Sequence, residues 1–212
     1  MESQAPATSG RAVLVASGLL WLVAVFGGMA TLARYASMPG EAREPLARWP
    51  PDSSLRPTPG RSLLVMLAHP RCPCTRASLG ELETVMARAG GRVDAYVLFL
   101  QPEDADGEWE SGGLWRHAAS IPGVTTRKDE GGVEARRFGA TTSGHVLLFD
   151  VEGRLRFSGG ITRSRGHAGD NPGRATLEAL LREREGEAEG RHPVYGCALE
   201  DSAERREEGM AP

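Results

Sequence analysis

Two apolar runs separated by a helix-like segment restrict the possible folds of this chain more than any other feature. Leu63–Ala68 and Ala95–Leu100 are continuous hydrophobic stretches bounded by turn-forming residues, a pattern typical of central strands covered on both faces. Between them, apolar side chains recur at helical spacing, at Leu79, Leu82, Val85, Met86 and Ala89. Gly90 and Gly91 follow as a helix stop. A strand, helix, strand crossover favours parallel pairing, so the residues predict an α/β domain.

The second half of the domain is predicted to add a hairpin and a final helix. His145–Asp150 and Arg154–Ser158 have the composition of two strands joined by a turn. Asn171 followed by Pro172 is a typical N-cap and first-turn pair, so we expect a helix to begin there. Two shorter helical stretches are expected, at Leu114–Ala119 and Gly132–Gly139.

The N-terminal part of the chain is a long apolar stretch followed by a proline-rich one. Residues 12–33 contain no ionisable side chain and are long enough to cross a bilayer as a helix. The stretch exceeds the roughly 7 to 15 apolar residues of a signal peptide, so we favour a transmembrane anchor over a cleaved signal sequence. Residues 34–61 contain many prolines and no periodic apolar pattern, and are expected to form an extended linker.

Composition and these boundaries together predict one globular domain. With 212 residues and 40% hydrophobic content, the chain can bury one ordinary core. The formal net charge of -3 gives no strong overall field, so nucleic acid is not an expected partner. The expected parts are an N-terminal segment (1–11), an anchor or signal sequence (12–33), a proline-rich linker (34–61), the domain (62–185) and a charged tail (186–212).

Cys72 and Cys74 are separated by one proline and lie between the first predicted strand and the first predicted helix. The start of a helix offers unpaired N–H groups and the positive end of the dipole, both of which stabilise a thiolate. Arg71 and Arg76 add positive charge nearby. A disulfide between residues i and i+2 closes a small, strained ring, so this pair would be readily reduced. The same spacing also suits two thiolates on one metal ion.

The order of these elements, with cysteines at the first helix start, resembles the thioredoxin superfamily over about Ser62–Glu185. The best segment is "FGATTSGHVLLFDVEGRL", residues 138–155. The resemblance implies a three-layer α/β fold with a central mixed sheet. With the anchor, it is similar to membrane-tethered thioredoxin-like proteins of the bacterial envelope. Two departures are the C-P-C motif in place of C-x-x-C, and Gly144 where the family has a cis-proline that helps to dock substrate polypeptides and discourages metal capture.

The first functional hypothesis is an extracytoplasmic thiol-disulfide oxidoreductase without a cofactor, facing the periplasm or cell exterior. Cys72, expected to be the more exposed sulfur, forms a mixed disulfide with a protein client or electron donor, and Cys74 resolves it. Aligning Pro73 and Cys74 with the end of the family motif would instead leave Arg71 at the usual nucleophile position. Reversible disulfides belong mainly outside the reducing cytoplasm, which favours an outward-facing domain.

The second hypothesis is a copper-binding delivery protein. The strand order implied by the resemblance brings His69, His145 and His167 to the edge where the cysteines lie. Two thiolates and one imidazole suit copper, and the predicted ligands are Cys72, Cys74 and His145. This set resembles that of SCO-type copper chaperones, whose cysteines are spaced more widely. Each histidine also has a simpler interpretation as a backbone-bonded, turn-shaping or solvated residue.

Two further questions stay open at the level of sequence. A peroxiredoxin-like peroxidase with Cys72 as the peroxidatic cysteine ranks third, because His69 stands where that family has a threonine. Cys197, in the tail, is consistent with a resolving thiol, a lone free thiol or an intermolecular partner.

Overall fold

A computed structural model describes residues 8–41, 43–44, 46–101, 112–182 and 190–199, and the chain divides into two compact units, Met1–Ser37 and Met38–Pro212. The first unit is a single helix, α1 (Thr8–Ser37). Within the described part of the chain, α1 is the one helix long and apolar enough to cross a membrane, over Gly10–Ser37. This agrees with the apolar stretch predicted at residues 12–33.

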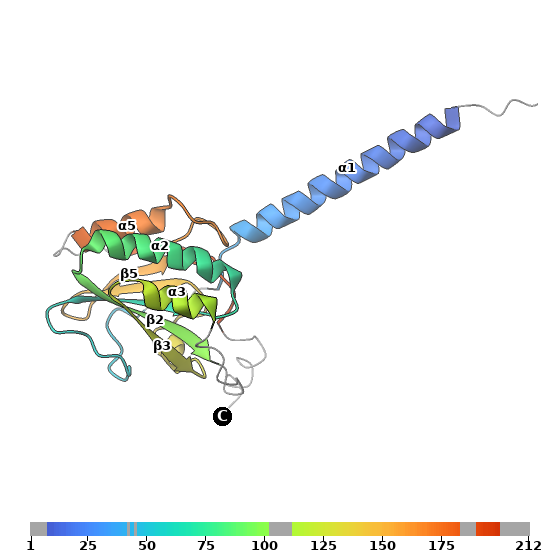
Figure 1. The fold of residues 1–212 in the computed structure, drawn as a ribbon. Coiled ribbons are helices and arrows are strands. Elements are labelled where there is room, and N and C mark those ends of the chain that lie inside the picture. The colour runs from blue at the N-terminus through green and yellow to red at the C-terminus, as the bar shows by residue number, and fades with distance from the viewer. Residues whose placement is uncertain (1–7, 42, 45, 102–111, 183–189, 200–212) are drawn as a thin grey trace, which may run out of the picture. The chain divides into compact units, whose positions relative to one another are not determined.

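The second unit contains a mixed six-stranded sheet with the strand order β3-β2-β1-β4-β5-β6 (Figure 1). The strands β1 and β2 pair in parallel, as predicted, and so do β2 with β3 and β5 with β6. The strand β4 runs antiparallel to both β1 and β5. The strands are β1 (Ser62–Ala68), β2 (Val93–Gln101), β3 (Val124–Glu130), β4 (His145–Phe149), β5 (Leu155–Gly160) and β6 (Gly190–Arg191). This is the thioredoxin-like α/β fold that the sequence predicted.

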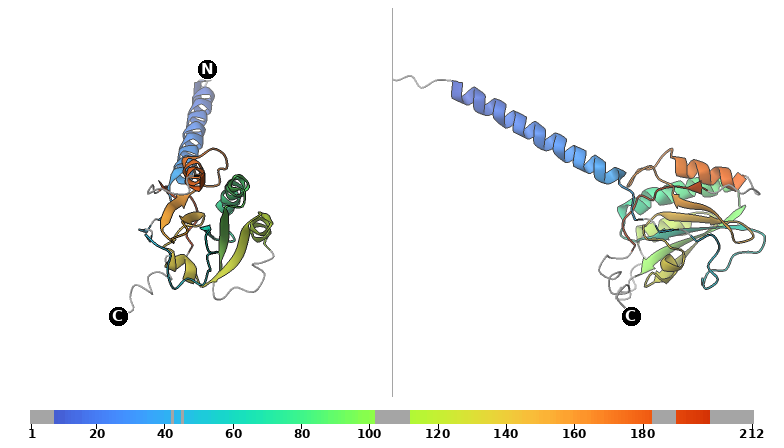
Figure 2. Two further views of the ribbon diagram at one scale, coloured as in Figure 1. Left: turned by 90° about the vertical axis from the view of Figure 1, so that its left-hand side faces the viewer. Right: turned by 180° about the vertical axis from the view of Figure 1, so that it is seen from behind.

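Three helices cover one face of this sheet, and the fourth covers part of the other (Figures 1 and 2). They are α2 (Pro73–Ala89), α3 (Gly113–Ser120) and α5 (Pro172–Arg182) on the first face, with α4 (Val133–Arg137) on the second. The α2 helix ends at Gly90, whose φ of 57° is the left-handed conformation that glycine adopts easily. The α5 helix begins as predicted, because Asn171 Oδ1 accepts a hydrogen bond from the Arg174 amide at 2.8 Å.

The extended linker predicted at residues 34–61 is corrected: residues 34–37 belong to α1, and described residues of the segment after α1 pack on the domain. Leu55 is 4% exposed and belongs to the core on the second face of the sheet. Trp49 packs edge-on against Phe138 and Phe149, with ring centroids 5.1 Å away in each case. The α4 helix is only five residues long, so the apolar side chains of this segment complete the cover of that face.

Two strands at the ends of the sheet were absent from the prediction. The edge strand β3 reads "VTTRKDE", so charged side chains replace the apolar pattern used to recognise a strand. The strand β6 has two residues and forms only by pairing with Phe157 and Ser158 of β5. Part of the predicted tail, residues 190–199, is therefore folded onto the domain. Residues 186–189 and 200–212 of that tail, and residues 1–7, lie outside the described part of the chain.

Candidate functional site

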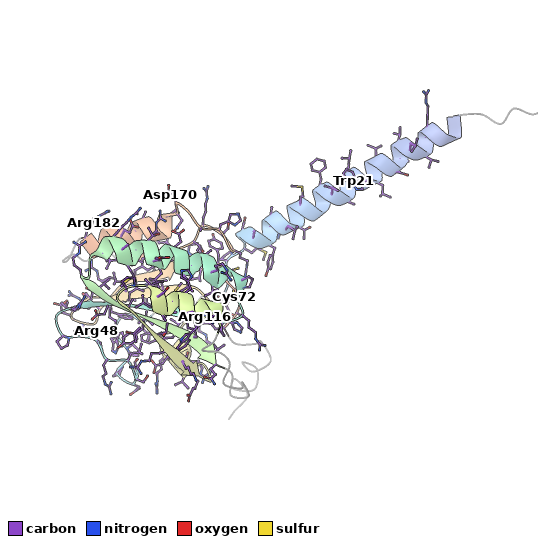
Figure 3. All side chains as sticks on the ribbon, viewed as in Figure 1. Trp21, Arg48, Cys72, Arg116, Asp170 and Arg182 are labelled. Atoms are coloured by element: carbon purple, nitrogen blue, oxygen red, sulfur yellow. The ribbon has the colours of Figure 1, made fainter. Side chains whose placement is uncertain are left out.

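The turn between β1 and α2 places Cys72 at the N-cap of the helix, where Figure 3 labels it. The Cys72 amide donates to His69 O at 3.1 Å, and the Thr75 amide donates to Cys72 O at 3.1 Å. Pro73 is the first helical residue, a position that suits proline because its missing N–H would have no partner there. Cys74 lies in the first turn, and the backbone amides of Cys74 and Thr75 face the Cys72 sulfur.

Ser143 ties this turn to the loop that precedes β4. Its hydroxyl accepts a hydrogen bond from the His69 amide at 2.8 Å and lies 2.9 Å from the Thr75 hydroxyl. The next residue, Gly144, donates its amide to Leu67 O at 2.7 Å. These contacts hold the two loops together at one edge of the sheet. Both residues adjoin positions singled out in the sequence, Thr75 after Cys74 and Ser143 before Gly144, but their contact with each other depends on the fold.

Gly144 gives this loop a backbone conformation that proline does not adopt. Its φ is 88°, a left-handed conformation that favours glycine. A Cβ at this position would lie 2.8 Å from Ser78 Oγ on α2. The described residues contain no cis peptide bond, so the departure from the family pattern noted in the sequence is a real difference in backbone geometry.

A third sulfur reaches the same turn from the C-terminal segment. Cys197 Sγ lies 2.8 Å from Cys72 Sγ, although 125 residues separate the two cysteines. All three cysteines of the chain are free thiols in this structure. The resolving role that the sequence left open for Cys197 is therefore compatible with its position.

Backbone pairing determines the position of Cys197. Its carbonyl accepts a hydrogen bond from the Ser143 amide at 2.8 Å, and the Leu199 amide donates to Thr141 O at 2.9 Å. Thr142 and Ala198 form an antiparallel bridge between these two hydrogen bonds. The short segment thus lies beside the 141–143 loop, held by one bridge and two hydrogen bonds.

The environment of the three thiols separates their acidities. Burial raises the pKa of Cys72, but hydrogen bonds from the Cys197 side chain and from the backbone of Cys197, Cys74 and Thr75 outweigh it, so this pKa is lowered overall. Burial, together with the charge and side chain of Cys72, raises the pKa of Cys74. Burial and the hydrogen bond with Cys72 raise the pKa of Cys197 to about 12. Of the three thiols, Cys72 is therefore the one whose surroundings lower its pKa.

The positive charge that acts on these sulfurs comes from a residue other than those predicted. Arg165, in the loop after β5, lowers the pKa of both Cys74 and Cys197 by its charge, against the larger effect of burial. It also donates to Gly196 O from Nη1. Arg71 and Arg76, the residues expected from sequence, are exposed. Arg165 is brought in from far along the chain, so spacing alone could not identify it.

The expectation that Cys72 is the more exposed sulfur is wrong. Cys72 is 1% exposed, whereas Cys74 and Cys197 are partly exposed. Cys197 and the segment that carries it lie against Cys72, because their backbone is paired with the neighbouring loop. The thiol with the lowered pKa, Cys72, is thus the buried one, and the two thiols that interact with it are partly exposed.

The structure does not bring His145 into a metal site with Cys72 and Cys74. The His145 ring is 6% exposed, and its Nε2 lies 2.8 Å from Ser158 Oγ on β5. Burial lowers the pKa of His145 to about 4, so its ring is neutral at ordinary pH. Among the described residues, no group of three or more His, Cys, Asp or Glu side chains is placed to hold a metal ion.

The other two histidines follow their simpler interpretations. His69 shapes the turn, since its Nδ1 accepts a hydrogen bond from the Arg71 amide at 3.2 Å. His167 is exposed, and its Nδ1 lies 3.1 Å from Arg165 O.

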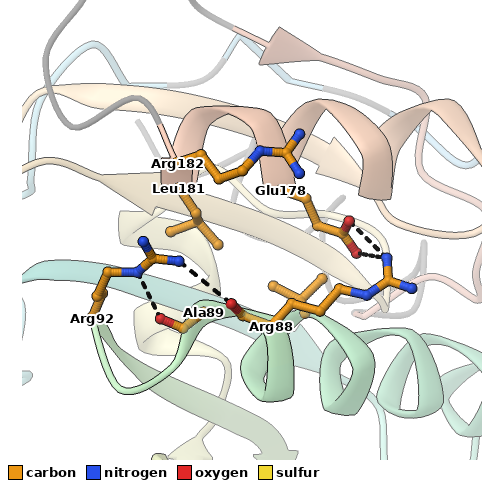
Figure 4. A pocket seen from close by; sticks show the side chains of 7 residues that line it. Arg88, Ala89, Arg92, Glu178, Leu181 and Arg182 are labelled. Carbon is orange, nitrogen blue, oxygen red and sulfur yellow. Dashed lines mark hydrogen bonds and ion pairs between the residues drawn. The ribbon is translucent and has the colours of Figure 1, made fainter.

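A hollow at the other end of α2 is separate from the cysteines (Figure 4). It lies between the last turns of α2 and the α5 helix, and it is lined by Val85, Arg88, Ala89, Arg92, Glu178, Leu181 and Arg182. Arg88 Nη1 contacts both carboxylate oxygens of Glu178, at 2.7 and 2.8 Å. Arg92 Nε donates to Ala89 O at 2.8 Å. Arg88, Arg92 and Glu178 thus bond to residues that line the hollow itself, so the three cysteines remain the candidate site.

No protein-family model and no curated protein matches this chain. Solved structures do match it. An uncharacterized conserved protein from Geobacillus kaustophilus is 16% identical, with a TM-score of 0.54, over 78% of this chain and 93% of that one. A hypothetical protein from Sinorhizobium meliloti 1021 is 23% identical, with a TM-score of 0.52, over 68% and 81%. A putative thiol:disulfide interchange protein from Chlorobium tepidum is 20% identical, with a TM-score of 0.42, over 60% and 82%. The first two share the fold of this chain.

Proposed function

We propose that this protein is a membrane-tethered thiol-disulfide oxidoreductase in which Cys72 and Cys74 exchange electrons with a protein client outside the cytoplasm. The observation that carries the proposal is Cys72 at the start of α2, where hydrogen bonds from Cys197, Cys74 and Thr75 lower its pKa. A thiolate is the nucleophile in disulfide exchange, and the helix amides that stabilise it also stabilise it as a leaving group.

The exchange proceeds in two steps that conserve electrons. The Cys72 thiolate attacks one sulfur of a client disulfide, so that a mixed disulfide forms and one client thiolate leaves. Cys74 then gives up its proton and attacks Cys72 Sγ, which forms the Cys72–Cys74 disulfide and releases the second client sulfur as a thiolate. The client gains two electrons and the protein loses two. The same steps in reverse oxidise a client dithiol.

The roles of the two cysteines follow from their surroundings. Cys72 has the lowered pKa and therefore supplies the thiolate. Cys74 is partly exposed and has a raised pKa, so it remains a thiol until the mixed disulfide removes the negative charge from Cys72. Because Cys72 is 1% exposed, a client must displace part of the cover over this sulfur before it reacts.

The proposed location rests on α1 and on the chemistry of the site. A helix of this length and composition is suited to hold the second unit at a membrane surface. A cysteine pair that cycles between thiol and disulfide works most readily in an oxidising compartment, which favours the periplasmic or exterior side. Copper delivery by Cys72, Cys74 and His145 stays a prediction, without support from the position of the histidine.

The test uses the full chain in detergent and insulin as a disulfide-bonded protein, with dithiothreitol as electron donor. We expect catalysed reduction of insulin by the native protein and a fall to the uncatalysed rate for Cys72→Ser. We expect Cys74→Ser to slow turnover at least tenfold, since the mixed disulfide at Cys72 then lacks its proposed resolving thiol. Arg182→Ala, at the exposed end of α5 far from the cysteines, is the matched control. Full activity of Cys72→Ser would overturn the proposal.

A further inference from the structure

We infer that Cys197 is a third redox cysteine, which takes over the bond to Cys72 and fastens the C-terminal segment across the site as a covalent clamp. The inference rests on the proposed function, because it needs an oxidised Cys72. It assigns a partner and a regulatory step to that site.

The first observation is the contact between the two sulfurs. Cys197 Sγ lies 2.8 Å from Cys72 Sγ, closer than an ordinary contact between two sulfur atoms, so the two side chains point directly at each other. The two residues come from the start of α2 and from the C-terminal segment bonded to the 141–143 loop, so their approach is not limited by the small ring that Cys72 and Cys74 must close. Of the two possible disulfides at Cys72, the one with Cys197 is therefore the less strained.

The second observation is that the residues around Cys197 are fitted to this position. A Cβ at Gly196 would lie 1.9 Å from Ser143 O, so only glycine permits the approach of the two backbones. Arg165 donates to the Gly196 carbonyl. Together with the pairing of Ser143 and Thr141 to this segment, these contacts set the register that directs Cys197 at Cys72 rather than into solvent.

The same segment is anchored upstream of Cys197. The His192 amide donates to Ser158 O at 3.1 Å, and the Val194 carbonyl accepts from the Gly40 amide at 2.8 Å. A Cβ at Gly160 would lie 2.7 Å from Pro193 O, so the segment lies directly on β5. Cys197 therefore meets Cys72 at high local concentration, and the meeting does not depend on a second molecule.

The chemical step is an isomerisation that needs no added oxidant. Cys197 loses its proton and attacks Cys72 Sγ in the Cys72–Cys74 disulfide. The Cys72–Cys197 bond forms, the Cys72–Cys74 bond breaks, and Cys74 leaves as a thiolate that takes up the proton. Two cysteines are oxidised before and after the step. The product leaves the partly exposed Cys74 as a free thiol, while the buried Cys72 is covered by a segment that can no longer separate from it.

The consequence is a resting form that resists reaction with clients until the clamp is opened. A reductant or an attacking thiol must first reach the Cys72–Cys197 bond, and Cys74 is the internal thiol best placed to do so. Closing the bond also links positions 125 residues apart, which restricts the unfolded chain and stabilises the folded oxidised protein.

The test equilibrates the full chain in detergent with oxidised and reduced glutathione, quenches exchange with acid, alkylates the free thiols and maps disulfides by mass spectrometry. We expect a Cys72–Cys197 disulfide with alkylated Cys74 in the native protein. Gly196→Val retains all three thiols but moves the segment, so it is expected to shift the disulfide to Cys72–Cys74. Cys74→Ser is expected to retain Cys72–Cys197.

The outcomes separate this inference from the proposed function. A native protein whose intramolecular disulfide is Cys72–Cys74, with Cys197 alkylated and no change in Gly196→Val, would overturn the clamp and leave the oxidoreductase intact. Insulin reduction that persists in Cys72→Ser would instead overturn the proposed function. A further arm starts the insulin assay from the oxidised proteins and adds dithiothreitol as the reductant. We expect the lag before insulin reduction to be at least severalfold longer in the native protein than in Cys197→Ser. Equal lags would contradict the clamp's protective role.

Discussion

At the scale of single residues, the site depends on how a few polar atoms surround one sulfur. Ser143 binds the cysteine turn to the loop before β4, and the amides of the helix start face Cys72. Arg165 brings the positive charge that was expected from nearer arginines. These atoms come together only in the folded chain, so the two cysteines could be predicted from sequence whereas their acidities could not.

Substitution of Gly144 by proline tests whether this loop accepts the residue that the family resemblance implies here. Gly144→Pro would remove the hydrogen bond to Leu67 O and replace a φ of 88° by about -65°, so we expect a loss of stability greater than about 1 kcal/mol. Gly80→Ala is the control, because that glycine lies inside α2 with open space around it, and the change should stabilise by about 0.5–1 kcal/mol. Urea unfolding of both variants makes the comparison. A neutral or stabilising Gly144→Pro would show that the loop accepts the family's proline.

His145 predicts a distinct pH dependence of stability. Its pKa is about 4 in the folded protein against 6.5 for a free histidine, because burial disfavours the charged ring. Between pH 6.5 and 4 the unfolded chain binds more protons at this histidine than the folded chain does. The free energy of unfolding is therefore highest above pH 6.5 and falls by up to about 1.4 kcal/mol per pH unit as the pH decreases. We expect His145→Gln to flatten this part of the curve, measured by urea unfolding from pH 7 to 4. The same slope in the native protein and in His145→Gln would contradict the account.

At the scale of elements, the sequence predicted those parts whose pattern is local. The strands β1, β2, β4 and β5 and the helices α2, α3, α4 and α5 lie where apolar spacing, capping residues and turns indicated. The edge strands β3 and β6 were missed, since one is charged and the other exists only through its partner. Local patterns also failed to predict the positions of Cys197 and of the segment before β1, because both depend on contacts with distant residues.

The proline-rich segment before β1 is predicted to contribute to folding stability. Leu55 is 4% exposed on the second face of the sheet, so Leu55→Ala should cost about 2–5 kcal/mol, from lost burial and the cavity left behind. Leu46→Ala is the matched control, because Leu46 is 39% exposed, and we expect a change within about 0.5 kcal/mol. Chemical denaturation gives both values. Equal effects of the two changes would mean that the segment is a free linker after all.

At the scale of the whole molecule, the chain combines an apolar helix with an α/β domain in which Cys197 lies beside Cys72. We expect the full chain to remain with membranes after an alkaline carbonate wash, and deletion of residues 8–37 to release the domain. Protease added to intact spheroplasts should digest the domain if it faces outward, as the proposed chemistry requires. Protection in intact spheroplasts and digestion only after lysis would place the domain in the cytoplasm and contradict the proposed location.

The most direct test of the central claim is a count of free thiols in the full chain across a series of glutathione redox buffers. Exchange centred on Cys72 predicts that the native protein loses two of its three thiols together in one reversible transition. It also predicts that Cys72→Ser loses that transition. Three thiols that stay free in every buffer, or an unchanged transition in Cys72→Ser, would contradict the account.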